Sequence, residues 1–381
     1  MKRICALFAL CIVLCGCASA PPAEPVEAVA VIATEETAPA TTAATEPADP
    51  LETLLSWMTI EERVGQLFLA RCPASDAAAE LSVYPLGGYI LYARDFTGHT
   101  PTSFSRTLSS YQNASAIPLL IAVDEEGGTV CRVSSYHTFR DVPFGSPRNL
   151  FAQGGMEAVL DAEQEKAEFL SSLGICVNMA PVCDVTTNTN AFMYARSLGQ
   201  SPETTADFVS ATVKIMDAQH VGSVLKHFPG YGNNTDTHTG MAVDSRSLQE
   251  LEDGDLIPFQ AGIQAGCDAI LMSHTIVTCL DDTLPVSLSP AAHQYLRQEM
   301  GFERVIVTDD LDMGAITDAY GSEEAAILAV LAGNDLLCST EYAIQYQAVL
   351  EAVNSGRIPM ETVDAAVMRI LRWKQDLGLL F

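Results

Sequence analysis

Eight short apolar runs, separated by stretches of helical character, divide this 381-residue chain from about Leu51 onward. Many of the runs are rich in β-branched residues, which favours strands. Continuous apolar strands that alternate with helices are typical of a parallel sheet covered by helices. Eight such units predict a (β/α)8 barrel, with an open doubly wound sheet as the alternative. The runs are Gln66–Arg71, Gly88–Leu91, Leu119–Val123, Ile175–Met179, Ser223–Lys226, Ala269–Met272, Val305–Thr308 and Asp335–Leu337.

The stretches between these runs carry apolar residues at helical spacing. No Gly-x-Gly-x-x-Gly motif follows the first strands, so a dinucleotide site has little support. The predicted helices are Met156–Gly174, Pro202–His220, Ser289–Met300, Glu323–Ala332 and a closing helix over Met360–Gly378. The residues of the closing helix that we expect to face inward are Val363, Val367, Ile370 and Leu371.

The first residues have the pattern of an export signal: a basic start, the apolar run Ile4–Leu14, and small residues after it. Because Leu14-Cys15-Gly16-Cys17 resembles a bacterial lipobox, we expect cleavage before Cys17 and lipid attachment to its thiol. The alternative is an ordinary signal peptide cut near Ala20. Residues 21–50 are mostly Ala, Thr, Pro and Glu and predict a disordered tether. The expected organisation is a signal peptide (1–20), the tether (21–50) and one barrel domain (51–381).

Charge and cysteine content exclude several functions. The formal net charge of −28 argues against binding nucleic acid or an anionic surface. An odd, scattered set of cysteines without Cys-x-x-Cys spacing predicts small core residues, with neither a disulfide framework nor a zinc site. The cysteines of the predicted domain are Cys72, Cys131, Cys176, Cys183, Cys267, Cys279 and Cys338.

Polar residues follow five of the predicted strands. In a barrel, the loops after the strands form one open face where function collects. Each residue alone has a structural explanation, such as a capping Asp, a surface Lys or a hydrogen-bonded core His. Five charged strand ends on one face indicate an active site. The segments are Asp124-Glu125-Glu126-Gly127-Gly128, Ala180-Pro181-Val182-Cys183-Asp184, Lys226-His227-Phe228-Pro229-Gly230, Ser273-His274 and Asp309-Asp310-Leu311-Asp312.

Three of these motifs, in this order, resemble glycoside hydrolase family 3, and within it the β-N-acetylglucosaminidase branch. The first is Val123–Gly128. The second is Lys226–Gly230, followed by Asp236-Thr237-His238, and the third is Val307–Leu311. The resemblance extends from Leu51 to the end of the sequence.

The resemblance implies roles for individual residues. The family nucleophile corresponds to Asp309, the acid/base to His238, and the partner of that His to Asp236. On chemistry alone Asp310 and Asp312 are rival nucleophiles, and only the family pattern selects Asp309. No cofactor or metal is implied. The residues that match the family's sugar-hydroxyl ligands are Asp124, Arg132, Arg196, Lys226 and His227.

The implied activity is the hydrolysis of terminal β-linked N-acetylglucosamine with retention of configuration, and the implied substrates are peptidoglycan fragments. We expect the protein to be lipid-anchored on the outer side of the bacterial cytoplasmic membrane or on another envelope membrane. The alternatives are a β-glucosidase or β-xylosidase of the same family and a non-catalytic sugar-binding lipoprotein. Phosphate could replace water as acceptor, because a His acid/base carries no negative charge to repel it. Two departures, Tyr231 for a usual His and Thr129 for a usual Arg, leave the pocket's shape open. We expect no second domain, which favours the N-acetylglucosaminidase branch.

Overall fold

The computed structural model of the protein describes residues 49–232 and 241–381. The predicted signal peptide, the lipidation site Cys17 and nearly all of the predicted tether lie outside the described residues, as do Asp236 and His238. Within the described part, no helix is both long and apolar enough to cross a membrane.

Eight strands, all paired in parallel, form a sheet in the order β11-β9-β7-β6-β3-β2-β1-β12. A parallel bridge between Val307 and Leu336 links the two end strands, so the sheet nearly closes on itself. The predicted (β/α)8 barrel is confirmed, and the doubly wound alternative is wrong. The strands are β1 (Phe68–Arg71), β2 (Gly88–Leu91), β3 (Leu120–Val123), β6 (Val177–Asn178), β7 (Gly222–Phe228), β9 (Ala269–Met272), β11 (Val305–Thr308) and β12 (Leu337–Ser339).

Side chains along one strand alternate between two buried clusters, as the period of a strand requires. In β3, Leu120 and Ala122 belong to a cluster to which every barrel strand contributes, which is the barrel interior. Ile121 and Val123 belong to the cluster shared with the surrounding helices. Both faces of the strands are therefore apolar, which explains why the sequence shows continuous apolar runs.

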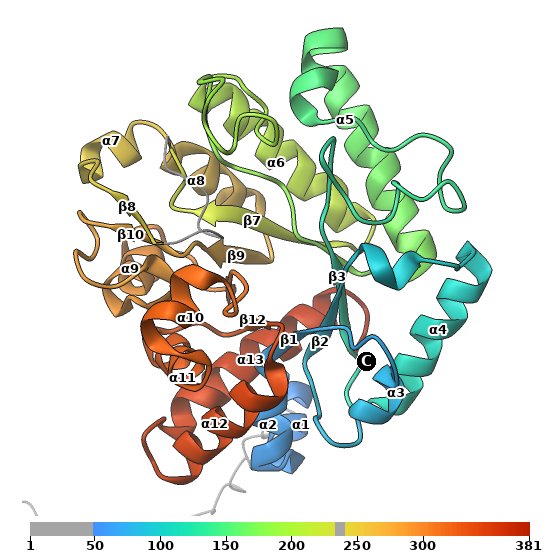
Figure 1. The fold of residues 1–381 in the computed structure, drawn as a ribbon, viewed down its shortest axis with the longest axis vertical. Helices are drawn as coiled ribbons and strands as arrows, with labels where there is room; N and C mark the ends of the chain where they lie inside the picture. Colours follow the sequence, from blue (N-terminus) through green and yellow to red (C-terminus); the bar gives the residue numbers. More distant parts are fainter. Residues whose placement is uncertain (1–48, 233–240) are drawn as a thin grey trace, which may run out of the picture. The chain divides into compact units, whose positions relative to one another are not determined.

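Helices lie outside these strands (Figure 1). Short strand pairs also occur at the loops, β4 (Glu125–Gly127) with β5 (Val130–Cys131) and β8 (Ala242–Asp244) with β10 (Thr275–Val277). The helices are α1 (Pro50–Trp57), α2 (Ile60–Gln66), α3 (Ala77–Glu80), α4 (Pro101–Ala114), α5 (Pro147–Leu173), α6 (Pro202–Ala218), α7 (Leu248–Glu252), α8 (Leu256–Ala265), α9 (Pro290–Gln294), α10 (Gly314–Tyr320), α11 (Ser322–Ala332), α12 (Tyr342–Asn354) and α13 (Met360–Asp376).

Four of the helices begin at a Ser-Pro or Thr-Pro pair. The hydroxyl of the N-cap residue accepts a hydrogen bond from a backbone N–H of the first turn, and proline at the next position needs no such partner. The sequence thus fixes where these helices start. The N-cap residues are Thr100, Ser146, Ser201 and Ser289.

Two predicted helices differ in detail from the structure. The backbone of α5 is not helical at Gly154 and Gly155, so the predicted helix from Met156 is its second part. The helix predicted over Ser289–Met300 is α9, which continues as a π-helix over Tyr295–Glu299. The closing helix is α13, and the four residues expected to face inward are all buried: Val363, Val367, Ile370 and Leu371.

All seven cysteines of the predicted domain are free thiols, and four of them are buried. Burial raises the pKa of the Cys72 thiol to about 12 and raises the pKa of the other three as well. Thiols that stay protonated behave as small apolar residues, which agrees with their interpretation as core residues. The four are Cys72, Cys183, Cys267 and Cys338.

Candidate active site

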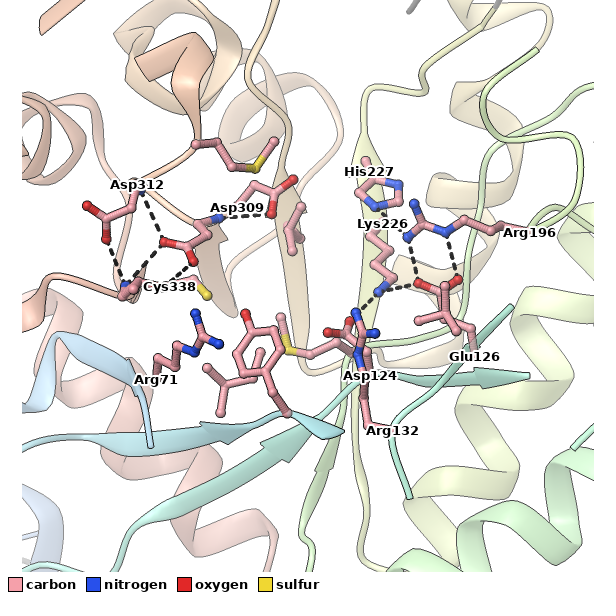
Figure 2. A pocket seen from close by; sticks show the side chains of 18 of the residues that line it. Arg71, Asp124, Glu126, Arg132, Arg196, Lys226, His227, Asp309, Asp312 and Cys338 are labelled. Carbon is pink, nitrogen blue, oxygen red and sulfur yellow. Dashed lines mark hydrogen bonds and ion pairs between the residues drawn. The ribbon is translucent and has the colours of Figure 1, made fainter. Parts of the chain in front are cut away.

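A cavity of about 490 Å³ lies at the carboxyl ends of the barrel strands (Figure 2). The loops after parallel strands meet at this end, which explains why residues far apart in the sequence share the cavity. The structure brings together six of the eight catalytic and sugar-binding residues predicted from the sequence. The other two, Asp236 and His238, lie outside the described residues. The six that line the cavity are Asp124, Arg132, Arg196, Lys226, His227 and Asp309.

Four charged residues, Asp124, Glu126, Arg196 and Lys226, form an ion-pair network, which we call the Lys226 cluster. The Lys226 Nζ lies 2.7 Å from an oxygen of Asp124 and 2.7 Å from Glu126 Oε1. Arg196 donates to both oxygens of Glu126, from Nη2 at 2.6 Å and from Nε at 2.8 Å. Such two-point pairing fixes the planes of the guanidinium and the carboxylate. Glu126, which the sequence analysis did not select, is the shared centre of the network.

The cluster stays charged despite its burial. Burial alone would raise the pKa of Glu126, but Lys226 and Arg196 outweigh it and hold that pKa well below its ordinary value. Burial likewise lowers the pKa of Lys226, yet Asp124 and Glu126 raise it above normal. Ammonium, guanidinium and carboxylate groups held side by side can donate to and accept from neighbouring hydroxyls. The cluster is therefore suited to bind a polyol such as a sugar.

His227 is oriented by the carboxylate of Asp184. Its Nδ1 lies 2.9 Å from Asp184 Oδ2, which also accepts from the His227 backbone N–H at 3.1 Å. The other ring nitrogen lies 3.2 Å from Arg196 Nη2, which can only donate. This network assigns the proton to Nδ1 and leaves Nε2 as an acceptor. Tyr231, one of the two departures from the family pattern, packs edge-on against the imidazole, with the two ring centroids 5.1 Å apart.

The three carboxylates after β11 differ in their hydrogen bonds. Asp310 accepts from the backbone N–H and the hydroxyl of Thr340, at 3.2 and 2.7 Å. Asp312 accepts from the backbone N–H groups of Thr340 and Glu341, at 2.8 and 2.6 Å. Both side chains thus anchor this loop to the segment after β12. Asp309 accepts at its Oδ1 from the backbone N–H of Asp310, at 2.9 Å. All three side chains line the cavity.

The three acidic residues after β3 have two separate tasks. Asp124 and Glu126 belong to the Lys226 cluster, whereas Glu125 is fully buried and turns away from it. The Glu125 carboxylate accepts from the backbone N–H of Val133 at 2.8 Å and bonds to the hydroxyl of Ser134. It therefore holds the segment after β5 in place. This segment carries Arg132 to the cavity.

Arg71 and Tyr92, which the sequence analysis did not select, also line the cavity. The guanidinium of Arg71 lies 4.7 Å from the centroid of the Tyr92 ring, and that of Arg132 lies 5.7 Å from it. Burial, with Cys338 and Asp124 nearby, raises the pKa of the Tyr92 phenol, so the ring stays neutral. Arg71 ends an apolar run, and a charged residue at a strand end was the one signal that pointed to it.

His274, which also follows a strand, is fully buried and has a structural position. Its ring nitrogens lie 2.8 Å from the Ser287 hydroxyl and 2.9 Å from the Asp310 carbonyl oxygen. Across residues 49–232 and 241–381, no three His, Cys, Asp or Glu side chains are grouped so as to hold a metal ion.

Comparison with known proteins gives a consistent result. Residues 59–373 match the glycosyl hydrolase family 3 N terminal domain. The chain is 31% identical to beta-hexosaminidase LpqI of Mycobacterium tuberculosis over 313 residues, 79% of each protein. It is 32% identical to beta-hexosaminidase A of Pseudoalteromonas piscicida, matching 78% of this chain but only 54% of that protein. A family 3 beta-N-acetylglucosaminidase from Paenibacillus has a similar structure, with a TM-score of 0.79, 32% identity, and coverage of 84% of this chain and 63% of that one. The chain belongs to glycosyl hydrolase family 3.

Proposed function

We propose that this protein is a retaining exo-β-N-acetylglucosaminidase that removes terminal β-linked N-acetylglucosamine. The observation that carries the proposal is the arrangement of the cavity. The Lys226 cluster, suited to sugar hydroxyls, and Asp309, which the family pattern selects as the nucleophile, line the same space. The relatives named beta-hexosaminidase support this choice of sugar.

The proposed reaction has two steps. A carboxylate oxygen of Asp309 attacks the anomeric carbon, the glycosidic C–O bond breaks, and His238 gives its proton to the departing oxygen. His238 then takes a proton from water, whose oxygen attacks the anomeric carbon and releases Asp309. Two inversions restore the β configuration. Asp236 orients the His238 ring and stabilises its protonated form.

A fluorinated sugar trap tests this assignment directly. A 5-fluoro N-acetylglucosaminyl fluoride should leave a covalent sugar on Asp309, found by peptide mass spectrometry. Asp309→Asn should nearly abolish turnover while circular dichroism stays unchanged. Label on Asp310 or Asp312 would contradict the proposal, because their oxygens anchor the loop.

Other activities are separated by simple assays. A panel of nitrophenyl β-glycosides distinguishes the N-acetylglucosaminide from a glucoside or xyloside. Absence of turnover on every member would favour a sugar-binding lipoprotein. Product analysis in phosphate buffer, by mass spectrometry, distinguishes free N-acetylglucosamine from its 1-phosphate and so identifies the acceptor.

We further propose that the substrate is a peptidoglycan fragment and that the protein is exported and lipid-anchored through Cys17. The support is the basic, apolar and small-residue pattern of residues 1–20. Cys17→Ala should move the protein from the membrane fraction to the soluble fraction or block its processing. Unchanged membrane association would contradict the anchor and leave the catalytic proposal intact.

A further inference from the structure

A single guanidinium, that of Arg246, joins the chain on either side of residues 233–240, the segment to which His238 belongs. The segment itself lies outside the described residues, so the evidence comes from the chain before and after it. Arg246 Nη2 donates to the backbone carbonyl oxygen of Gly230, before the segment, at 3.0 Å. The same nitrogen donates to Asp244 Oδ2, after the segment, at 2.6 Å. One rigid group therefore sets the separation of these two parts of the chain.

Two buried carboxylates hold the Arg246 side chain in this position. Its Nε lies 3.1 and 2.9 Å from the two oxygens of Asp244, and its Nη1 donates to Oδ2 of Asp255, the N-cap residue of α8. Burial lowers the pKa of Arg246, but the hydrogen bond to Asp244 and the charge of Asp255 raise it above its ordinary value. The guanidinium therefore stays charged, and its pairing with both oxygens of Asp244 fixes its plane.

The chain before the segment is shaped to receive these side chains. Gly230 and Gly232 have φ angles of +111° and +56°, which favour glycine. A Cβ atom at Gly232 would lie 2.7 Å from Arg246 Cζ, and one at Gly230 would lie 2.4 Å from Asp255 Oδ1. The guanidinium and the carboxylate therefore pack directly against the main chain, with no room for a larger residue at either glycine.

Each part of the chain also has an anchor of its own. Before the segment, the backbone N–H of Tyr231 donates to Asp184 Oδ1 at 2.7 Å. After the segment, β8 pairs in parallel with β10, and the backbone carbonyl oxygen of Asp244 accepts from the N–H of Thr278 at 2.9 Å. These anchors fix the two parts to different strand-end loops. Arg246 adds the link from one part to the other.

Such a link has a chemical use at this place. A general acid must lie within hydrogen-bond reach of the oxygen that it protonates, and a small displacement lowers the rate steeply. A segment whose ends are held at a fixed separation has fewer arrangements than one whose ends move independently. In the proposed reaction His238 acts twice, first as acid and then as base, so both steps depend on where its segment is held.

We propose that Arg246 is a positioning residue for His238, because it joins Gly230 to Asp244 and so holds both ends of the segment that carries the acid/base. This inference rests on the proposed function, since it takes His238 as the proton donor. Arg246 is not among the described residues that line the cavity. It acts through the segment, without contact to the substrate.

Dependence on the leaving group tests the proposal. Arg246→Gln should lower kcat/KM for a disaccharide with terminal β-linked N-acetylglucosamine by about 10- to 100-fold, part of the 10²–10⁴-fold that general acid–base catalysis contributes. For the dinitrophenyl glycoside, kcat/KM should change by less than about 3-fold, because this phenolate leaves without a proton. Its kcat should fall, because attack by water in the second step still needs a base. Azide needs no base and should restore that kcat.

A double variant separates positioning from a general effect on the fold. In the His238→Ala background, Arg246→Gln should cause no further loss of kcat/KM on the disaccharide, because no acid remains to be positioned. Arg246→Lys keeps the charge but cannot pair with two points of Asp244, so it should recover only part of the activity. Gly232→Ala places a methyl group against the guanidinium and should show the same leaving-group dependence. It provides the test if circular dichroism shows that Arg246→Gln does not fold.

The matched control is Arg304→Gln. Arg304 also pairs with two carboxylates, those of Asp268 and Asp376, but it lies next to the first residue of β11, away from the segment. The loss of these ion pairs should leave the ratio of kcat/KM for the two substrates unchanged.

The outcomes distinguish the inference from the proposed function. If His238→Ala slows both substrates equally, the acid/base assignment fails and the inference fails with it. If His238→Ala shows the leaving-group dependence but Arg246→Gln slows both substrates equally, the inference is wrong while the proposed function stands. A further loss in the double variant, equal to that in the wild-type background, leads to the same conclusion, because Arg246 then acts independently of His238.

Discussion

Lys374 offers a sharp test of how charge is buried in this barrel, because its enclosed amine bonds to the neutral side chain of Gln66. It lies on α13 and is fully buried. Its Nζ donates to the side-chain oxygen of Gln66 at 2.6 Å, while the Gln66 amide nitrogen donates to the carbonyl oxygens of Pro85 and Leu86. Burial lowers the pKa of Lys374 to about 7, and Cys176 offsets this only in part.

The sign of the resulting pH dependence follows from proton binding in the two states. An unfolded lysine has a pKa of about 10.4, so between pH 7 and that value the unfolded chain holds a proton that the folded protein has released. The free energy of unfolding therefore rises with pH, by about 1.4 kcal/mol per unit. Between pH 7 and pH 9 the free energy of unfolding rises by about 2 kcal/mol. Well below pH 7 the lysine is protonated in both the folded and the unfolded state, so its contribution no longer changes with pH.

Lys374→Met removes this dependence, because methionine has similar length and no charge. The lost hydrogen bond to Gln66 adds a cost of about 1–3 kcal/mol at every pH. The free energy of unfolding of the variant, taken relative to that of the wild type, should therefore fall by about 2 kcal/mol from pH 7 to pH 9. Unfolding in guanidinium chloride at several pH values, under reducing conditions, measures this difference in the free energy of unfolding. The control is the variant Lys214→Met, which changes an exposed lysine. A difference that is constant over this range would show that Lys374 is not buried as a neutral amine.

Three further predictions concern the site. His238→Ala should slow cleavage of a disaccharide by about 10²–10⁴-fold and cleavage of a dinitrophenyl glycoside much less, because only the sugar leaving group needs a proton. Equal slowing of the two substrates would refute the acid/base role. Glu126→Gln should cost about 3–5 kcal/mol of stability by leaving Lys226 and Arg196 without their shared carboxylate. Denaturant unfolding against the exposed Glu168→Gln checks this, and equal stabilities would mean that the network is dispensable. Exhaustive chelation should leave activity unchanged, because a carboxylate and a histidine suffice for the mechanism; loss restored by added metal would overturn that.

The fold was predictable because its signals are local. Each of the eight apolar runs contains or overlaps a barrel strand, and β2, β9 and β11 have the predicted bounds. The errors occur where the backbone departs from a regular period. β6 is only Val177–Asn178, and the helix after Ser289 turns into a π-helix, which apolar spacing cannot reveal.

The candidate site was predictable only in part. The family pattern assigned roles to six residues that the structure gathers at one cavity, but it assigned none to Glu126 or Asp184. The position of Glu126 depends on Arg196, 70 residues away, and that of Asp184 on His227, 43 residues away. Which of several adjacent acids meets a distant cation is decided by how neighbouring strands pack. No local pattern contains that information.

Acidic residues occur in runs at this site, and the members of a run have different partners. After β3, Asp124 and Glu126 bind Lys226 while the residue between them, Glu125, anchors the segment after β5. After β11, Asp310 and Asp312 both hold the loop at Thr340, and Asp309 precedes them.

In both segments, a carboxylate that faces the cavity adjoins one that anchors the chain. After β3 the extended backbone turns successive side chains to opposite sides. After β11 the chain turns instead, and Asp312 in this turn accepts from the backbone N–H groups of Thr340 and Glu341. A catalytic carboxylate must be held within a fraction of an ångström of its productive position. The hydrogen bonds of Asp310 and Asp312 to backbone N–H groups hold the loop that carries Asp309, and so they give the proposed nucleophile a rigid support.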